Sequence, residues 1–92
     1  MKVDFDLGKK LLTLETRGLD MARAGEILTG LSYSFDDDRR DYGEKRNITV
    51  GFLDERMVVL VWTERRGICR VISLRKANER EQAFYGSRMG RP

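Results

Sequence analysis

Basic side chains gather near the carboxyl end of this 92-residue chain, in the segment from Arg65 to Lys76. Five of those twelve residues are basic and none is acidic. Arginine stays charged at any working pH, and its planar guanidinium matches the paired oxygens of a phosphate group. The segment therefore predicts binding of a polyanion, and we favour RNA. The five basic residues are Arg65, Arg66, Arg70, Arg75 and Lys76.

Arg70 lies within an otherwise apolar stretch of this segment, and no acidic residue is close to it in the sequence. A cation there costs free energy unless it has a partner or a task, so its position indicates a functional site. A solvated face of a β-hairpin is the alternative. Arg70 and Arg75 differ by an odd number of positions, so an ideal strand would point them to opposite faces. Both reach one cleft if the strand ends before Arg75 or contains a β-bulge.

Glu81 and Tyr85 are candidates for proton transfer, because residues four apart are neighbours on one face of a helix. Either could accept or donate a proton while the arginines hold a phosphate. Glu81 has an alternative role, since its spacing from Asn78 is that of a capping box. Tyr85 could equally pack its ring on the sheet, and with an ordinary pKa of about 10 it is a poor base unless cations lower that pKa.

Three other features each have two interpretations. Trp62 ends an apolar run and belongs to the core, with stacking on a nucleobase as the alternative. Cys69 is predicted to be a small buried hydrophobe, since no partner for nucleophilic catalysis lies near it. The acidic run Asp36 to Asp38 is predicted to be an exposed loop, with docking of a basic partner as the bolder interpretation.

Composition sets the limits on fold and function. A chain of 92 residues forms one domain, 1–92, and its tail, 87–92, is predicted to be disordered. Lys and Arg number 18 against 15 Asp and Glu, so the position of the charges matters more than their net value of +3. One cysteine and no histidine exclude an internal disulfide and make a metal site or cofactor unexpected. No apolar run is long enough for a membrane span, and we expect a cytoplasmic protein.

Two helices are predicted in the first third of the chain. Asp6 can cap a helix that runs to about Arg17 and ends at Gly18. Asp20 can cap a second helix that ends at Gly30. Each has an apolar face at helical spacing, formed by Leu7, Leu11 and Leu14 in the first and by Met21, Ala24, Ile27 and Leu28 in the second.

The remaining pattern is that of strands followed by a helix that starts at Asn78 and ends at Gly86. The order β-α-α-β-β-β-β-α predicts an α+β fold with an antiparallel sheet of about four to five strands. We expect three tight hairpins, with the two early helices packed on one face of the sheet. The predicted strands cover residues 1–5, 32–35, 47–52, 57–62 and 68–74.

Short motifs resemble the BrnT-type toxins of bacterial type II toxin–antitoxin modules, in order from about residue 3 to residue 85. The strongest part runs from Arg70 to Tyr85, where an Arg-x-Ile-Ser-x-Arg-Lys-Ala segment precedes Glu and Tyr. Earlier parts are Asp4-Phe5-Asp6 with Lys9, Arg17-Gly18-Leu19, Ala24 and Thr63-Glu64-Arg65. The chain departs from the common family pattern at Thr13, Thr16-Arg17 and Trp62, where the family often has asparagine, Lys-His and histidine.

The resemblance implies a small RelE-like domain, ribonuclease activity that halts translation, and neutralisation by a cognate antitoxin. That antitoxin is expected to be of the BrnA type with a ribbon-helix-helix domain, so operator DNA is bound only through it. Carried over residue by residue, the resemblance places Arg65, Arg70, Arg75 and Lys76 in the family's basic cluster and Glu81 and Tyr85 at its C-terminal helix positions. We expect catalytic roles for Arg70, Arg75, Lys76, Glu81 and Tyr85. The expected RNA contacts are Arg65, Arg66, Trp62 and Arg17.

The mechanism we expect is attack of a ribose 2′-hydroxyl on the adjacent phosphorus without a metal. Arg70 and Arg75 would stabilise the phosphorane, Lys76 or Arg65 would assist the leaving oxygen, and Glu81 or Tyr85 would take the 2′-proton. The alternative is a non-catalytic nucleic-acid-binding or degenerate toxin subunit that acts through the antitoxin complex in operon repression. Such a binder would give only a salt-dependent shift of the nucleic acid.

Overall fold

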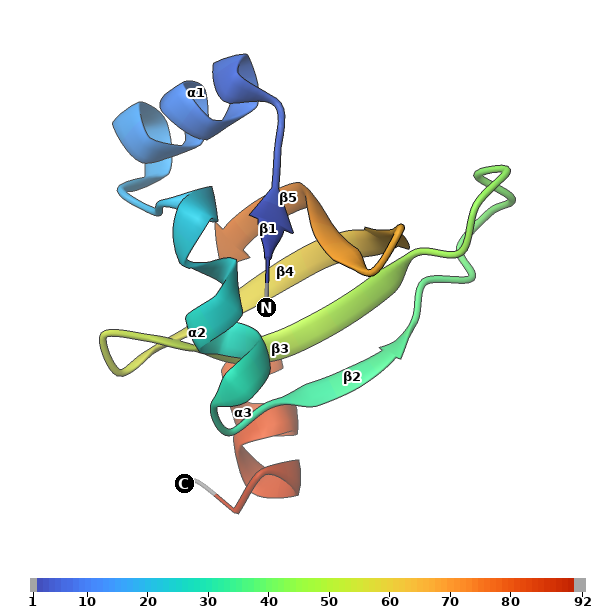
Figure 1. Ribbon diagram of the computed structural model, residues 1–92. Coiled ribbons are helices and arrows are strands. Elements are labelled where there is room, and N and C mark those ends of the chain that lie inside the picture. The colour runs from blue at the N-terminus through green and yellow to red at the C-terminus, as the bar shows by residue number, and fades with distance from the viewer. Residues whose placement is uncertain (1, 91–92) are drawn as a thin grey trace.

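The computed structural model describes residues 2–90, which form a five-stranded sheet with helices on both faces (Figure 1). The strand order is β1-β5-β4-β3-β2. The elements in chain order are β1 (Val3–Asp4), α1 (Leu7–Arg17), the 3₁₀ turn η1 (Met21–Arg23), α2 (Ala24–Thr29), β2 (Tyr33–Asp36), β3 (Asn47–Leu53), β4 (Arg56–Arg65), β5 (Ile68–Lys76) and α3 (Glu79–Arg88).

The predicted α+β class and element order are confirmed, with two corrections to the sheet. The first is that β1 pairs with β5 in parallel, so the sheet is mixed. The second is that only two of the three hairpins are tight, because residues 37–46 form a longer connection between β2 and β3. Within residues 2–90, no helix has the length and apolar composition required to cross a membrane.

The two tight hairpins are joined by two-residue turns with positive φ at both positions. Asp54 and Glu55 have φ values of 51° and 65°, and Arg66 and Gly67 have values of 54° and 76°. Such turns match the right-handed twist of the strands they join, and they fix the register on either side. The Arg66–Gly67 turn therefore sets the pairing of β5 with β4 from Ile68 to Val71.

The sheet carries one apolar core on each face. The larger core packs α2 and η1 against one face around Ile27 and Leu60, both fully buried at 0% exposure. Gly51 permits this close approach, because a Cβ there would lie 2.7 Å from Ile27 Cγ2. The smaller core lies on the other face, where Val59 is buried and Tyr85 of α3 packs against the same cluster. The central strand β4 is covered on both faces, since Met57 to Val61 are all buried.

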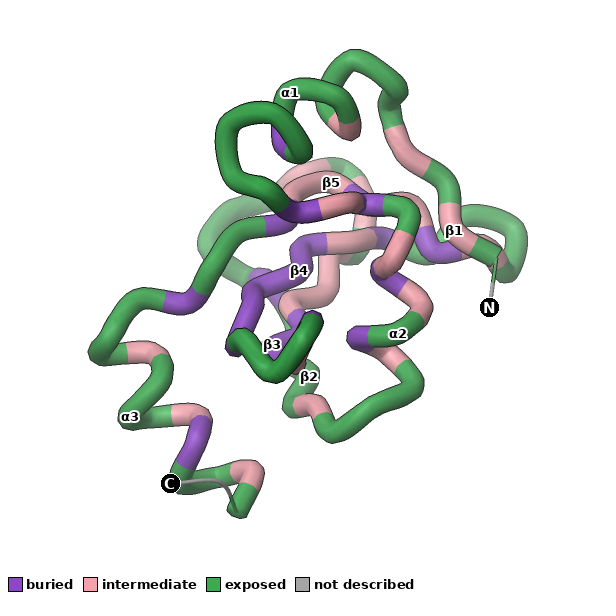
Figure 2. The backbone as a smooth tube through the Cα atoms, turned by 90° about the vertical axis from the view of Figure 1, so that its left-hand side faces the viewer, coloured by how far each residue is buried: buried purple, intermediate pink, exposed green. Residues whose placement is uncertain are grey.

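The leucine face of α1 does not pack on the sheet, which corrects the expected packing of this helix. Leu7, Leu11 and Leu14 are 63%, 54% and 43% exposed, whereas Thr13 is buried. Figure 2 shows the helix as exposed along most of its length. The 3.6-residue period predicted the helix correctly, but its polar side is the one turned toward the domain.

The helix ends follow the predicted caps, except at the start of the second helix and at the end of α3. Asp20 caps the 3₁₀ turn η1, and α2 begins at Ala24 without a side-chain cap. The Asp6 side chain accepts from the backbone N–H of Lys9, and Gly18 ends α1 in the left-handed conformation with φ 67°. The capping box of Asn78 with Glu81 is present. The helix runs past Gly86, which is buried within it, and ends at Arg88. The last two residues of the predicted disordered tail lie outside the described residues.

Candidate active site

A β-bulge in β5 brings the two central arginines of the sequence prediction onto one face of the sheet. The pairing of β5 with β4 shifts by one residue after Val61. Arg70 therefore lies opposite Thr63, and Arg75 lies opposite Val59. Positions 59 and 63 share a face because alternate residues of a strand point the same way. The bulge that we named as a condition for a shared cleft is thus present.

On this face a groove of about 270 Å³ lies between the sheet and α3. Its apolar walls come from β2, β3 and β4, at Phe35, Ile48, Val50, Val59 and Val61. Its polar groups come from β5, α3 and the loop after β2, and they are Arg39, Ser73, Arg75, Glu81 and Tyr85. Three of the five predicted catalytic residues, Arg75, Glu81 and Tyr85, therefore line one groove.

Arg75 and Glu81 form a bidentate ion pair inside this groove. Arg75 donates Nη1 and Nη2 to the two carboxylate oxygens of Glu81, at 2.7 and 2.8 Å. The hydrogen bonds from Arg75 hold the pKa of Glu81 at about 2, and the Asn78 backbone N–H lowers it further despite partial burial. Glu81 is therefore both the predicted helix cap and a member of the groove. While paired, it is a weak base.

Arg39 is the groove residue that sequence reasoning missed. It donates Nε and Nη2 to Asp37, both at 2.7 Å, and Nη1 is not part of this pair. The Asp37 side chain is 0% exposed, which corrects the prediction of an exposed acidic run at this residue, while Asp36 and Asp38 are exposed as predicted. Hydrogen bonds from Arg39 hold the pKa of Asp37 at about 2, although burial opposes this. A buried carboxylate thus fixes a guanidinium at the groove.

Tyr85 connects the polar groups of the groove to a cluster of aromatic rings. Its ring stacks on Phe35 with centroids 5.9 Å apart, and it lies 5.8 Å from Tyr33 and 4.9 Å from Phe84. Burial, followed by the charge of Glu81, raises the pKa of Tyr85 above its ordinary value. The phenol therefore stays protonated at neutral pH, and Tyr33 and Phe84 remain 40% and 47% exposed beside it.

The other two predicted catalytic cations lie outside the groove. Arg70 is on the groove face but pairs with Asp4 through Nη1 at 2.9 Å, a contact created by the pairing of β1 with β5. Lys76 lies opposite Val58, so its side chain is on the face covered by α2 and η1. The basic side chains of the segment do not all converge, and Arg75 is the one that lines the groove.

The four predicted RNA contacts are spread over the molecule. Arg65 pairs with Glu44 at 3.1 Å, and Arg66 is exposed in the β4–β5 turn. Arg17 donates Nη1 to the Leu74 carbonyl at 2.8 Å, away from the groove. The fourth residue, Trp62, lies in β4.

Trp62 packs against the larger core and is half-buried there. Its Nε1 donates to the hydroxyl of Thr49 at 2.9 Å, and Thr49 is fully buried. The same hydroxyl lies 2.7 Å from Ser34 Oγ. The core interpretation, which we favoured from the sequence, accounts for these contacts.

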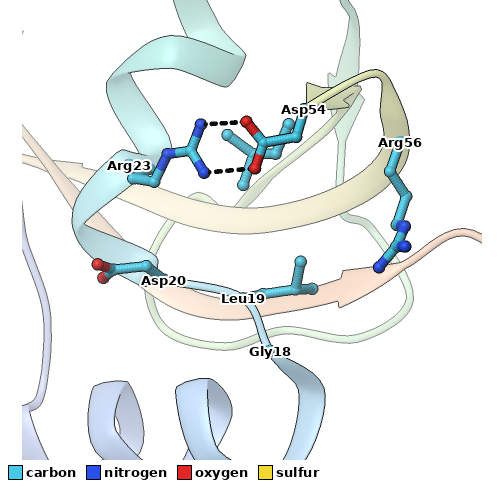
Figure 3. Close-up of a pocket in the computed structure, with 7 residues that line it drawn as sticks. Gly18, Leu19, Asp20, Arg23, Asp54 and Arg56 are labelled. Atoms are coloured by element: carbon cyan, nitrogen blue, oxygen red, sulfur yellow. Dashed lines mark hydrogen bonds and ion pairs between the residues drawn. The ribbon is translucent and has the colours of Figure 1, made fainter.

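A second hollow, of about 150 Å³, lies between the start of η1 and the β3–β4 turn (Figure 3). Arg23 dominates it, with two hydrogen bonds to Asp54 at 2.7 and 2.9 Å and two to Glu26 at 2.7 and 2.8 Å. All three guanidinium nitrogens of Arg23 donate to these carboxylates. Arg23 therefore connects η1 to the β3–β4 hairpin through Asp54. The groove beside α3, in contrast, brings two guanidinium groups together with a carboxylate and a phenol.

Comparison with protein families decides the class of the protein. The family model described as ribonuclease toxin, BrnT, of type II toxin–antitoxin system matches residues 5–81. The chain belongs to this BrnT family. The match includes Arg39, Arg75 and Glu81, and it confirms the resemblance seen in the sequence. Membership also implies that the protein has an antitoxin partner. Comparison with curated proteins gave no match.

Proposed function

We propose that this BrnT-family protein is a metal-independent endoribonuclease that cleaves single-stranded RNA in the groove beside α3. The observation that carries the proposal is the meeting of Arg39 and Arg75 in one groove with a carboxylate and a phenol. Two guanidinium groups suit a phosphate that gains negative charge during the reaction. No histidine is needed for this arrangement.

Arg39 and Arg75 would stabilise the charge on the phosphorane oxygens. Arg39 is oriented by its bidentate pair with Asp37, so this side chain requires little reorganisation when the substrate binds. Arg75 exchanges its bidentate partner Glu81 for the phosphate. Asp37 engages Nε and Nη2 of Arg39, which leaves Nη1 for a phosphate oxygen. A well-placed donor of this kind contributes about 3–4 kcal/mol to transition-state stabilisation.

Glu81 and Tyr85 would move the protons. A phosphate that competes for Arg75 removes the hydrogen bonds that depress the pKa of Glu81, and the carboxylate then becomes a better base. Glu81 takes the 2′-proton as the 2′-oxygen bonds to phosphorus. Tyr85 gives its proton to the departing 5′-oxygen, and the phosphorus–oxygen bond breaks. The products are a 2′,3′-cyclic phosphate and a 5′-hydroxyl.

This assignment revises the expected leaving-group role of Lys76 or Arg65. Both lie outside the groove, while the phenol of Tyr85 is protonated within it. We retain Arg70 as a flanking contact, because it lies on the same face at about 13 Å from Arg75 along the strand. A neighbouring phosphate of the same RNA could reach it by competing with Asp4.

The aromatic cluster supports a single-stranded substrate. Tyr33 and Phe84 expose ring surface next to Tyr85, and unpaired bases stack on such rings whatever their sequence. A base adjoining the scissile phosphate would rest on this surface. Duplex RNA does not offer its bases in this way.

In the cell, we propose that cleavage halts translation in the cytoplasm until the cognate antitoxin neutralises the protein. The family membership supports the antitoxin partner. A ribbon-helix-helix domain on that antitoxin would let the complex repress its own operon, with operator DNA contacted through the antitoxin.

The test is cleavage of a single-stranded RNA by the purified protein in excess EDTA, with mass spectrometry of the new ends. We expect 2′,3′-cyclic phosphate and 5′-hydroxyl ends, and no cut at a position carrying a 2′-deoxyribose. Ends with a 5′-phosphate, or a need for added metal, would contradict the mechanism. A salt-dependent shift without any new ends would favour the non-catalytic binding alternative.

A further inference from the structure

The outward half of α1 carries four leucines that the domain leaves uncovered. Leu7, Leu11, Leu12 and Leu14 are 63%, 54%, 58% and 43% exposed. The inward side carries the buried Thr13 instead. A helix normally turns its apolar face to its own domain, so this inverted arrangement indicates a partner.

A basic hollow of about 410 Å³ adjoins the carboxyl end of the same helix. It is lined by Thr16 and Arg17 of α1 and by Arg75 and Lys76 of β5. Three of these four residues are cations, and no acidic residue lines the hollow. Within residues 2–90, neither Arg17 nor Lys76 forms an ion pair. The hollow therefore fits carboxylate groups.

We propose that α1 and this hollow form the docking surface for the antitoxin, through an amphipathic acidic segment of that protein. Its apolar side chains would cover the four leucines of α1. Its carboxylates would enter the hollow beside Arg17 and Lys76. The surface follows from the exposed leucines and the unpaired cations, and the antitoxin as the occupant follows from the family membership.

Charge and area favour this occupant over a second copy of the chain. The helix has eleven residues and is about 16 Å long, so a pair of α1 helices would form a small contact. Stable interfaces cover about 800 Å² on each partner, which requires a partner that extends beyond the leucines. The neighbouring hollow provides that extension. Its two cations without an ion pair in the described part of the chain, Arg17 and Lys76, call for acids from the partner.

The same surface offers a route to inhibition, which depends on the proposed ribonuclease function. Arg75 lines both the basic hollow and the catalytic groove. A carboxylate of the antitoxin in the hollow would compete with RNA phosphate for this guanidinium. The antitoxin would then neutralise the protein from the edge of β5 without filling the groove.

The experiment measures binding of the purified antitoxin of the same toxin–antitoxin pair to the full-length protein by titration calorimetry. Leu11→Glu should weaken binding at least about tenfold, and Leu11→Gln should weaken it less. Leu31→Glu is the matched control, because Leu31 is 50% exposed away from α1 and its variant should bind as the wild type does. Lys76→Glu should weaken binding, more strongly at low salt than at high salt.

A second readout uses cells that express the protein together with the antitoxin. Leu11→Glu should still arrest growth, since Leu11 lies outside the groove, and the antitoxin should no longer relieve the arrest. Unchanged antitoxin affinity in Leu11→Glu would overturn the docking proposal. A wild-type dimer that Leu11→Glu converts to a monomer, with antitoxin affinity unchanged, would overturn it in favour of self-association. Weakened antitoxin binding in a protein that never cleaves RNA would contradict the ribonuclease proposal alone.

Discussion

Arg75 and Glu81 face each other across the groove at 2.7 and 2.8 Å, and Glu81 at the same time accepts the Asn78 backbone N–H at 2.9 Å. One carboxylate thus caps α3 and holds the guanidinium at the end of β5. The strand and the helix that follows it are locked together at the point where we propose that phosphate binds. Exchange of Glu81 for phosphate on Arg75 is the step that would convert the resting groove into a catalytic one.

Acid should weaken the fold through this pair. The pKa of Glu81 is about 2, below its ordinary value of 4.5. A carboxyl with a depressed pKa stabilises the folded state above its unfolded-state pKa and loses that contribution as the pH falls toward the folded-state value. We expect the free energy of unfolding to fall between about pH 5 and pH 2. Urea titrations across this range should show a flatter decline for Glu81→Gln.

Glutamine can keep the cap of α3 while it removes the charge, so Glu81→Gln isolates the ionic contribution. Arg75→Gln should flatten the decline in the same way, because the pKa of Glu81 then returns toward its ordinary value. A steep decline retained in both variants would show that the pair does not stabilise the fold. The buried Asp37, whose pKa is also about 2, should account for the decline that remains.

Removing Arg39 should lower RNA cleavage although this residue lies far from β5 in the sequence. Arg39→Ala should reduce the single-turnover rate about 100-fold, the effect of losing one donor to a developing oxyanion. Arg40→Ala is the matched control, since Arg40 follows directly and its ring contact is with Tyr42 at 5.0 Å. Equal rates for Arg39→Ala and the wild type would remove Arg39 from the site.

The exposed rings should contribute to RNA affinity more than to the fold. Tyr33→Leu and Phe84→Leu keep apolar volume but lose the stacking surface, which is worth about 1–3 kcal/mol per base. Fluorescence anisotropy with a 2′-O-methyl RNA that resists cleavage measures this directly. Wild type should prefer the intact RNA to one with an abasic position, and the variants should lose that preference. A preference unchanged in both variants would argue against a base-stacking surface at this point.

Trp62→Phe should affect stability and leave RNA binding intact. The change removes the Nε1 hydrogen bond to the buried Thr49 and leaves that hydroxyl with one contact fewer. The expected loss is about 1–3 kcal/mol in the free energy of unfolding, measured by urea titration. A fall in RNA affinity without a fall in stability would instead favour a stacking role for Trp62.

The sequence predicted the elements well because caps, turns and periodicity are local. Arg75, Glu81 and Tyr85 were found together for the same reason, since they lie at the junction of one strand and the next helix. The β-bulge was named only as a condition for Arg70 and Arg75 to share a face, because no residue type in β5 indicates a bulge. The pairing of β5 with β4 in the structure shows that Arg70 and Arg75 lie on the same face of the sheet.

Long-range contacts account for what the sequence left out. Arg39 stands among acidic residues in the chain, and its place in the groove depends on how the loop after β2 folds around the buried Asp37. Arg70 has no acid nearby in sequence, yet the parallel pairing of β1 brings Asp4 to it. The leucines of α1 predicted an apolar face correctly, but periodicity carries no information about which neighbour that face meets.

The most direct test of the groove is the single-turnover rate of RNA cleavage by Arg75→Ala, compared with Arg65→Ala. Both residues are arginines paired with a glutamate, at 2.7 Å for Arg75 and 3.1 Å for Arg65, but only Arg75 lines the groove. We predict a loss of at least about 100-fold for Arg75→Ala and less than about threefold for Arg65→Ala. Equal rates in the two variants would contradict the assignment of the groove as the site of RNA cleavage.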